Sequence, residues 1–423
     1  MATNGALPAT WSVRAAVQYA LAHNPDTRAA VERISAAEAD LKAARAALYP
    51  QLGVAAEYSR TNNPMYSFGN ILNQGVFSTA IDFNDPGTTD TLQAKGVVEY
   101  RIYNGGRDWA AIEAAENHGQ ASRLENEAVR LQLEFKVVKA FCTIVQAGEV
   151  VTARQSALEA ISASLAVAQA RFDEGSLLRE EMLNLEVQQS RAQEQLIQAR
   201  HSLSLAQRAF LRLLGLQGQQ VSLDPQATPA QEIPATTETG KRPELKALAA
   251  QIKAREAMVR QARGGALPTA DLFGAYQVDK GLELDEGSGN SWATGVRLNY
   301  TLFNGGRTGA EVERAEAQLR ETRERLRNLE LAFDLEMEQA VLALQQEEQR
   351  LKVTTKMVES ARESARLSRL RFMEGLVLSS ELIDTENRLT DALLSHSLAR
   401  ASRKIAIADL RRAAGLPQFS QGN

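Results

Sequence analysis

The chain has 423 residues, of which 5% are aromatic and 24% charged, and its formal net charge is −4. Acidic and basic residues are interspersed, which argues against a nucleic-acid partner because nucleic-acid-binding proteins concentrate positive charge. No run reaches the ~18 consecutive apolar residues that a membrane-spanning helix needs, so a helical membrane protein is excluded.

Alanine, leucine, glutamine, glutamate and arginine dominate long tracts, a composition typical of extended helices. The single cysteine, Cys142, excludes an internal disulfide and is expected to be a small buried apolar residue. The first residues lack a basic segment followed by an apolar one, so we interpret any secretory signal as removed or replaced.

The chain is a tandem duplication. Residues 100–116 and 300–316 both contain a strand-like run, an Asn-Gly-Gly-Arg break and an alanine- and glutamate-rich continuation. The same offset relates Gly175 to Gly375. We therefore expect a first repeat at 1–215, a linker or equatorial belt at 216–241, a second repeat at 242–415 and a tail at 416–423.

The first repeat is expected to begin with a short amphipathic helix, followed by a second helix at 24–48. Its other elements are strands at 51–59 and 96–103, a long helix at 107–173 and a return helix at 180–214. In the second repeat we expect strands at 270–279 and 292–303, a long helix at 307–373 and a return helix at 379–414.

The first repeat also has an insertion between its two strands. The stretch between Tyr58 and Tyr100 is 18 residues longer than its counterpart in the second repeat, and it is rich in Asn, Gly, Pro and Thr. This composition predicts a long loop.

Apolar and polar residues alternate in the strands, which gives each strand one apolar and one polar face. Leu272, Tyr276 and Val278, for example, share one face. The pattern is typical of a transmembrane β-strand, although a soluble hairpin also fits it. Of the 23 aromatic residues, 13 lie within 49–103 and 267–303, as interfacial girdles would require, and this favours the membrane.

Each repeat changes abruptly from strand to helix at an Asn-Gly-Gly-Arg sequence. Glycine adopts the backbone angles of such a turn at little cost. The strand-to-helix turns are therefore expected at Asn104, Gly105, Gly106 and Arg107, and at Asn304, Gly305, Gly306 and Arg307.

No proline interrupts either long helix, and at ~1.5 Å per residue each would be about 100 Å long. Apolar residues at heptad spacing predict left-handed coiled coils. The helix at 24–48 and the return helix at 180–214 together approach the length of one long helix. We therefore expect two short helices to stack in line beside each long one.

Four strands cannot close a barrel, and an open sheet edge in hydrocarbon leaves backbone groups without hydrogen bonds. If the strands enter a membrane, several chains must share them. Two chains supply eight strands, and side chains fill the interior of a barrel of that size. Three chains supply twelve strands, and a twelve-stranded barrel leaves room for water. A conducting protein of this kind is therefore expected to be a homotrimer.

The doubled motifs resemble the TolC family of outer-membrane efflux and secretion channels. The resemblance rests on the Asn-Gly-Gly-Arg boundaries, the Arg-Phe-x-Glu-Gly turns, the opening "NPDTRAAVERISAAEADLKAARAALYPQL" and the closing "LRRAAGLP". It implies a mainly α protomer with a β-barrel part, built from long coiled-coil helices and four transmembrane strands. The trimer would form a 12-stranded β-barrel and a 12-helix α-barrel.

The resemblance also implies a function. The protein would be the passive exit duct of a tripartite efflux pump or type I secretion system, in the outer membrane lipid of a Gram-negative bacterium and extending into the periplasm. Its partners would be a periplasmic adaptor (membrane fusion) protein and an inner-membrane pump of the RND, ABC or MFS class. Docking of adaptor and pump would open a gate at the periplasmic tip, and no cofactor is implied.

By the same resemblance, the helix-to-helix turns form the tip. The residues expected to contact the adaptor are Arg171, Gly175, Ser176, Leu177, Arg371, Gly375, Leu376 and Val377. A cation-selective constriction would use Glu381 and Asp384, with Glu181 in the first repeat, where Asn184 lacks a charge. Val377 stands where the family often has a basic latch residue, so Arg369 and Arg371 are the nearby candidates.

Enzymatic readings find no support, because the four histidines are scattered and no metal-binding or nucleophile pattern occurs. No catalytic residue and no metal ligand is therefore assigned. The competing interpretation is a soluble coiled-coil periplasmic scaffold without channel activity. That interpretation explains the heptads but not the two-faced strands that recur in both repeats.

Overall fold

The computed structural model describes Pro8 and residues 10–218, 221–224, 232–234, 239–283 and 286–419. The chain folds into two compact units. The first contains residues 1–33, 122–247 and 326–423, and the second contains 34–121 and 248–325. Among the described helices, none has the length and apolar character needed to cross a membrane.

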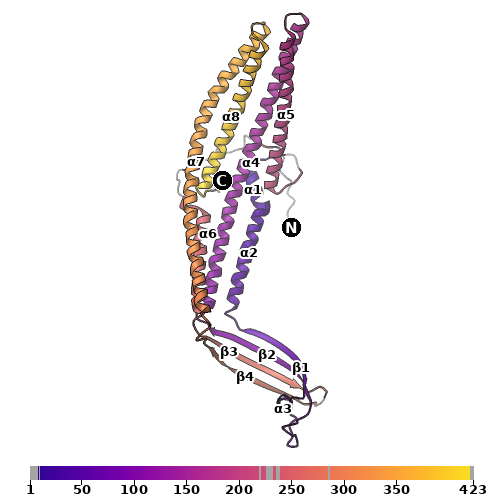
Figure 1. Ribbon diagram of the computed structural model, residues 1–423, viewed down its shortest axis with the longest axis vertical. Coiled ribbons are helices and arrows are strands. Elements are labelled where there is room, and N and C mark those ends of the chain that lie inside the picture. The colour runs from indigo at the N-terminus through magenta and orange to yellow at the C-terminus, as the bar shows by residue number, and fades with distance from the viewer. Residues whose placement is uncertain are drawn as a thin grey trace. The chain divides into compact units, whose positions relative to one another are not determined.

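The second unit contains one antiparallel sheet of four strands in the order β1-β2-β3-β4 (Figure 1). Pairing of β2 with β3 joins the two halves of the chain in one sheet. The strands are β1 Gln51–Thr61, β2 Thr89–Tyr103, β3 Thr269–Lys280 and β4 Ser288–Asn299.

Several strand boundaries differ from those expected, most of them by one or two residues. The larger differences are at the start of β2 and at both ends of β4, which begins at Ser288 rather than at 292 because Ser288 pairs with Lys280. β2 begins at Thr89 rather than at 96, because its first residues pair with the end of β1 as far as Thr61. β4 ends at Asn299 rather than at 303, because Asn299 pairs with Thr269, the first residue of β3, and the residues beyond it have no partner strand in the described chain.

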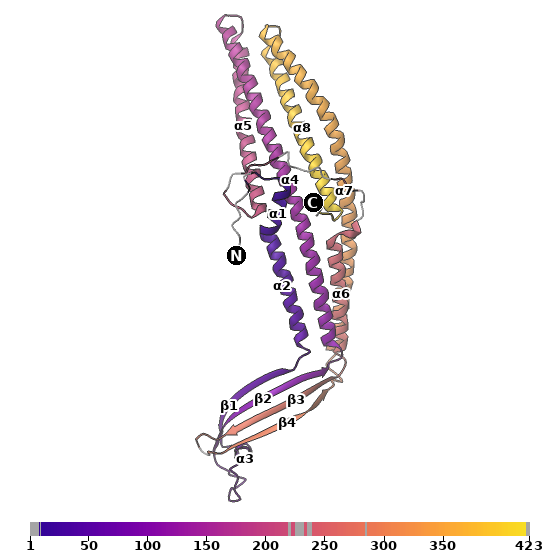
Figure 2. The same ribbon diagram turned by 180° about the vertical axis from the view of Figure 1, so that it is seen from behind.

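The expected loop between β1 and β2 contains a helix, α3, at Pro64–Asn73, so the prediction of an unbroken loop was wrong. The Asn63 side chain accepts a hydrogen bond from the Met65 N–H (3.1 Å), and Pro64 occupies the first turn. Asparagine followed by proline is typical of a turn, but the same pair is also favourable at a helix N-terminus, with asparagine as the N-cap and proline as the first helical residue. Both views place α3 beside the end of the sheet farthest from the start of α4 (Figure 2).

Two helices of 67 residues begin directly after the sheet: α4 at Arg107–Asp173 and α7 at Arg307–Met373. Each turns back into a shorter helix, α5 at Arg179–Leu214 or α8 at Ser379–Ala413. The remaining helices are α1 Val13–His23, α2 Pro25–Ala46 and α6 Pro243–Gly264, with a 3-10 turn at Thr239–Lys241.

The apolar core of the first unit lies along the paired helices. One cluster joins α1, α4 and α5 and includes Cys142, which is buried as expected. A second joins α7 to α8 around Leu344 and Leu410. A third, at the turns, contains Ala168, Leu185, Phe372 and Leu382.

Short helices abut end to end within the first unit. A Cβ at Gly215, just past α5, would lie 2.9 Å from the carbonyl oxygen of His23, which ends α1 immediately before α2. A Cβ at Gly415, just past α8, would lie 3.1 Å from Cα of Arg242, which precedes α6. Glycine is needed at both positions, where φ is also positive.

Candidate functional site

The two turns between long and return helices have the same backbone structure. At the first, the Gly175 N–H donates to the Phe172 carbonyl (2.9 Å) and the Ser176 N–H to the Arg171 carbonyl (2.8 Å). Gly375 repeats the pattern, and both glycines have a φ of +77°. These are the hydrogen bonds of an α-helix C-cap whose glycine has the left-handed backbone conformation, so the turn itself requires the glycines.

The side chains after the turn glycines divide into buried and exposed sets. Leu177 and Val377, which sequence reasoning expected to contact an adaptor, pack against the apolar cluster at the turns. Leu376 is exposed, together with two leucines that sequence reasoning did not single out, Leu178 and Leu378. The spacing alone could not separate them, because the turn changes the direction of successive side chains.

Next to the turns, two of the hydrogen bonds among the described residues connect the first hairpin to the second, and a third, from Gln188 to Asn387 (2.8 Å), lies farther along α5 and α8. Arg171 donates from Nη1 to the Phe372 carbonyl (3.1 Å), and its Nη2 would lie 2.8 Å from a Cβ at Gly375. The Ser379 N–H donates to Oε2 of Glu181 (3.2 Å). Because the N-terminus of α8 has no capping side chain of its own, Glu181 supplies a carboxylate to its free N–H groups.

Glu381 and Asp384 are both exposed, and each is paired with an arginine. Glu381 accepts from Nη1 of Arg371 (3.3 Å), and Asp384 forms an ion pair with Arg388 (2.6 Å) one turn along α8. Arg388 was missed by the sequence reasoning. The signal for it was the i, i+4 spacing on one helix, which brings such side chains together.

A buried carboxylate lies just beyond these acids. Glu386 is almost inaccessible, and Arg369 binds it with two nitrogens, one of them at 2.7 Å from Oε2. The hydrogen bonds to Glu386 raise the pKa of Arg369, so the guanidinium stays charged. Arg369 therefore holds α7 to α8 within the second hairpin and does not reach the first.

The sheet of the second unit has one apolar and one polar face. Residues opposite one another across the strands share a face, and Leu52, Val98, Gly274 and Thr294 follow one such line. Exposed apolar side chains on this face include Val54, Tyr58, Leu272, Tyr276, Trp292, Val296 and Leu298.

The opposite face carries most of the charged groups of the sheet, whereas Arg60, Asp90 and Lys280 lie at one end of the apolar face. Arg101 donates from Nε to Asp271 (3.3 Å), and Asp279 accepts from Gln93 (2.9 Å) and Gln277 (3.0 Å). A sheet with exposed apolar residues on one side and paired polar residues on the other suits lipid on the first side and water on the second.

The strand-to-helix turns use their glycines as expected. Gly105, Gly106, Gly305 and Gly306 all have positive φ. Asn104 is buried, and its carbonyl accepts from Nε of Arg107 (3.2 Å), whereas Asn304 donates from its side chain to Thr308 (2.7 Å). The turns thus fix the direction of the chain where each strand ends.

A family model described as "Outer membrane efflux protein" matches residues 16–216 and 238–416. The chain belongs to the outer membrane efflux protein family. Its pyoverdine export relative OpmQ of Pseudomonas putida is 25% identical over 94% of this chain and 84% of that protein. The family's efflux protein BepC of Brucella suis is 25% identical over 52% of this chain but only half, 50%, of its own length.

A solved structure of a family channel has the same fold. The CmeC outer membrane channel of Campylobacter jejuni superposes with a TM-score of 0.85 at 17% identity, covering 100% of this chain and 92% of CmeC. The fold is therefore a tandem-repeat helical structure with a small β part. As an outer membrane efflux protein, the chain is a channel of the Gram-negative outer membrane, and the soluble scaffold alternative is set aside.

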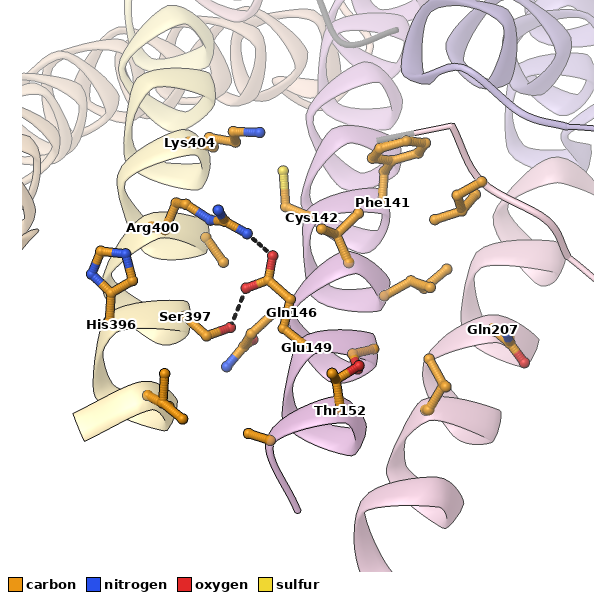
Figure 3. A pocket seen from close by; sticks show the side chains of 18 of the residues that line it. Phe141, Cys142, Gln146, Glu149, Thr152, Gln207, His396, Ser397, Arg400 and Lys404 are labelled. Atoms are coloured by element: carbon orange, nitrogen blue, oxygen red, sulfur yellow. Dashed lines mark hydrogen bonds and ion pairs between the residues drawn. The ribbon is translucent and has the colours of Figure 1, made fainter. Parts of the chain in front are cut away.

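The first unit of this efflux protein also contains a cavity of about 970 Å³ between α4, α5 and α8. Figure 3 shows Glu149 of α4 between Ser397 and Arg400 of α8; Ser397 donates to Glu149 at 2.6 Å, and Arg400 forms an ion pair with it. Phe141 and Cys142 form part of the apolar wall. The described residues include no cluster of three metal-binding side chains, here or elsewhere.

Proposed function

We propose that three copies of this chain form the exit duct of a tripartite efflux pump or type I secretion system. The sheet carries the proposal, because within the described chain β1 and β4 each pair with one strand only. Lipid contact on the apolar face would leave these edges without hydrogen bonds unless β4 of one copy pairs with β1 of the next. Three copies then supply twelve strands around a watery interior.

The strand-to-helix turns support the same assembly. Gly105 is pressed against the carbonyl of Gly264 at the end of α6, where a Cβ would not fit. A Cβ at its counterpart Gly305 would meet no other atom of the described chain within 4 Å. In a ring of alternating repeats, the place beside Gly305 would be taken by the end of α2 of the next copy. The repeats 1–215 and 242–415 would thus supply a 12-helix α-barrel with pseudo-sixfold symmetry.

We further propose that the helix turns form the periplasmic tip and its gate. Threefold symmetry would place Glu381 and Asp384 in rings around the axis, where carboxylates attract cations. Their pairing with Arg371 and Arg388 reduces the charge of each ring, so selectivity depends on both partners. Opening requires the links of Arg171 and Glu181 to the second hairpin to break.

The proposed opening signal is the binding of a periplasmic adaptor, which acts with an inner-membrane pump of the RND, ABC or MFS class. The adaptor would contact the exposed turn residues, including Ser176, Leu178, Leu376 and Leu378. An adaptor shifts the gate only if it binds the open tip better than the closed one. The duct itself is passive, and the pump selects the cargo.

Assembly and conduction can be tested on the detergent-extracted protein. Native mass spectrometry should show a trimer, and planar bilayers should show ion conductance that rises when adaptor is added to the tip side. A dispersed monomer that needs no detergent would contradict the proposal, as would a trimer that never conducts.

A further inference from the structure

Helix α3 lies on the polar face of the sheet. Its Asn70 side chain donates to Oγ1 of Thr89 (3.0 Å), a residue of the polar row of β2. On β4, Gly289 belongs to the same face, and a Cβ there would collide with the carbonyl oxygen of Asn73. The helix therefore crosses from β2 to β4 on the side that faces away from lipid.

Buried polar contacts attach α3 firmly to this end of the sheet. The Gln74 side chain donates to the Asp90 carbonyl (2.7 Å), and Ser67 donates to the Thr61 carbonyl (3.0 Å). The Asp90 carboxylate accepts the N–H groups of Leu282 and Glu283 (3.0 Å each), which anchors the β3–β4 turn at the same place. These hydrogen bonds thus fix α3 in place on the sheet.

The side of α3 that faces away from the sheet is apolar and exposed. Met65 is 80% exposed and Tyr66 66%, with Leu72 at the far end of the helix. Phe68, Phe77 and Phe83 form an aromatic cluster with ring centroids 4.6–6.1 Å apart, and Phe77 and Phe83 are exposed as well. The twenty residues 62–81 contain no charged side chain, in contrast to the charged polar face of the sheet below them.

We propose that the α3 helices of three copies meet on the channel axis and close the outer mouth by apolar contact. This inference rests on the trimer proposed above, which makes the polar face the inner one. It adds a second barrier at the opposite end of the duct from the helix turns. Apolar constrictions stop ions by excluding water and need no charge.

Other occupants fit the same surface less well. Lipid tails lie against the other face of the sheet, and lipid phosphate groups would require cationic residues, which 62–81 lack. The α3 helix of another copy has the same apolar surface. The proposed pairing of β4 with β1 of the next copy places the α3 helices of neighbouring copies close to one another.

Cysteine cross-linking tests the contact directly. In a Cys142→Ala background, Met65→Cys should give a covalent dimer when the trimer is treated with a short bismaleimide. At most two thirds of the subunits should be cross-linked, because each reagent joins two of the three cysteines and leaves the third without a partner. Val54→Cys is the matched control, since Val54 is 89% exposed but lies on the lipid face. It should give no dimer.

A conductance measurement separates a contact from a barrier. With the tip links removed by Arg171→Ala and Glu181→Ala, the further change Met65→Glu should raise conductance at least twofold, because a charge at the constriction holds water. Replacing 64–81 by a short Gly-Ser linker should do the same. An intact trimer with neither cross-link nor increase would overturn the inference while leaving the exit duct in place; absence of a trimer would remove the proposed function itself.

Discussion

The carboxylate of Glu181, on α5, accepts the backbone N–H of Ser379, at the start of α8. A side chain of one hairpin thereby caps a helix of the other. Helix capping of this kind contributes about 1 kcal/mol, and the helix dipole favours a negative charge there. The contact can exist only while the two turns stay together, so it stabilises one arrangement of the tip.

Removing this cap should favour the open tip. Glu181→Gln is expected to increase the open probability roughly three- to tenfold in planar bilayers, since about 1 kcal/mol of closed-state stability is lost. Glu180→Gln, at an exposed neighbouring position, is the control and should behave like the parent. Equal open probabilities for the two variants would show that the cap has no part in gating.

The paired acids of α8 should control ion selectivity. Glu381→Gln with Asp384→Asn is expected to lower the ratio of cation to anion permeability and to weaken block by multivalent cations. Arg388→Gln should have the opposite effect, because it frees Asp384 from its ion pair. Reversal potentials in a KCl gradient measure both, with Glu374→Gln as an exposed control. Unchanged selectivity in the double variant would refute the gate assignment.

Arg369 should matter more for stability than for conduction. Arg369→Ala leaves the buried carboxylate of Glu386 without its partner and is expected to cost about 2 kcal/mol, less than a fully buried pair because Arg369 is partly exposed. Adding Glu386→Gln should recover part of the loss. Thermal unfolding of the detergent-bound protein provides the comparison, with exposed Arg362→Ala as control. Equal melting temperatures for Arg369→Ala and the parent would contradict this account.

Glu336 makes stability depend on acidity. Burial by itself would raise the pKa of Glu336, but hydrogen bonds from Arg242 and Arg412 outweigh burial and lower the pKa below its ordinary 4.5. The guanidinium of Arg242 also stacks on the Phe333 ring, 3.4 Å from its centroid. The stability that the Glu336–Arg242 ion pair contributes is therefore fully present above pH ~4.5 and is lost as the pH falls through the lowered pKa of Glu336.

Glu336→Gln should accordingly reduce the stability at neutral pH by about 1–3 kcal/mol and show a smaller further loss on acidification. Melting temperatures between pH 3 and 7 test this, with Glu338→Gln, at an exposed position on the same helix, for comparison. A parent and a variant whose curves run parallel over the whole range would disprove the linkage.

Cys142 should react slowly while the chain is folded. Burial, only partly offset by Lys404, raises the pKa of its thiol to about 11. At pH 8 the thiolate is then roughly 200-fold scarcer than for an ordinary cysteine. A chromogenic disulfide reagent should therefore label the native protein far more slowly than the unfolded chain, and equal rates would place the thiol at the surface.

Much of the protein follows from local sequence. Periods of seven and of two, together with uninterrupted tracts and paired glycines, determine the long helices, the two faces of the strands and the places where the chain turns. Burial of Cys142 is predictable in the same way. These features depend on residues close together in the chain, which is why a single sequence reveals them.

The tertiary structure decided the remainder. The length of β2 depends on the reach of β1, and α3 is held by contacts with strands far from it in sequence. Glu181 caps a helix almost two hundred residues away, and Arg369 reaches Glu386 across a turn. Sequence alone could list these charged residues but not pair them, because a pairing depends on which helices lie side by side.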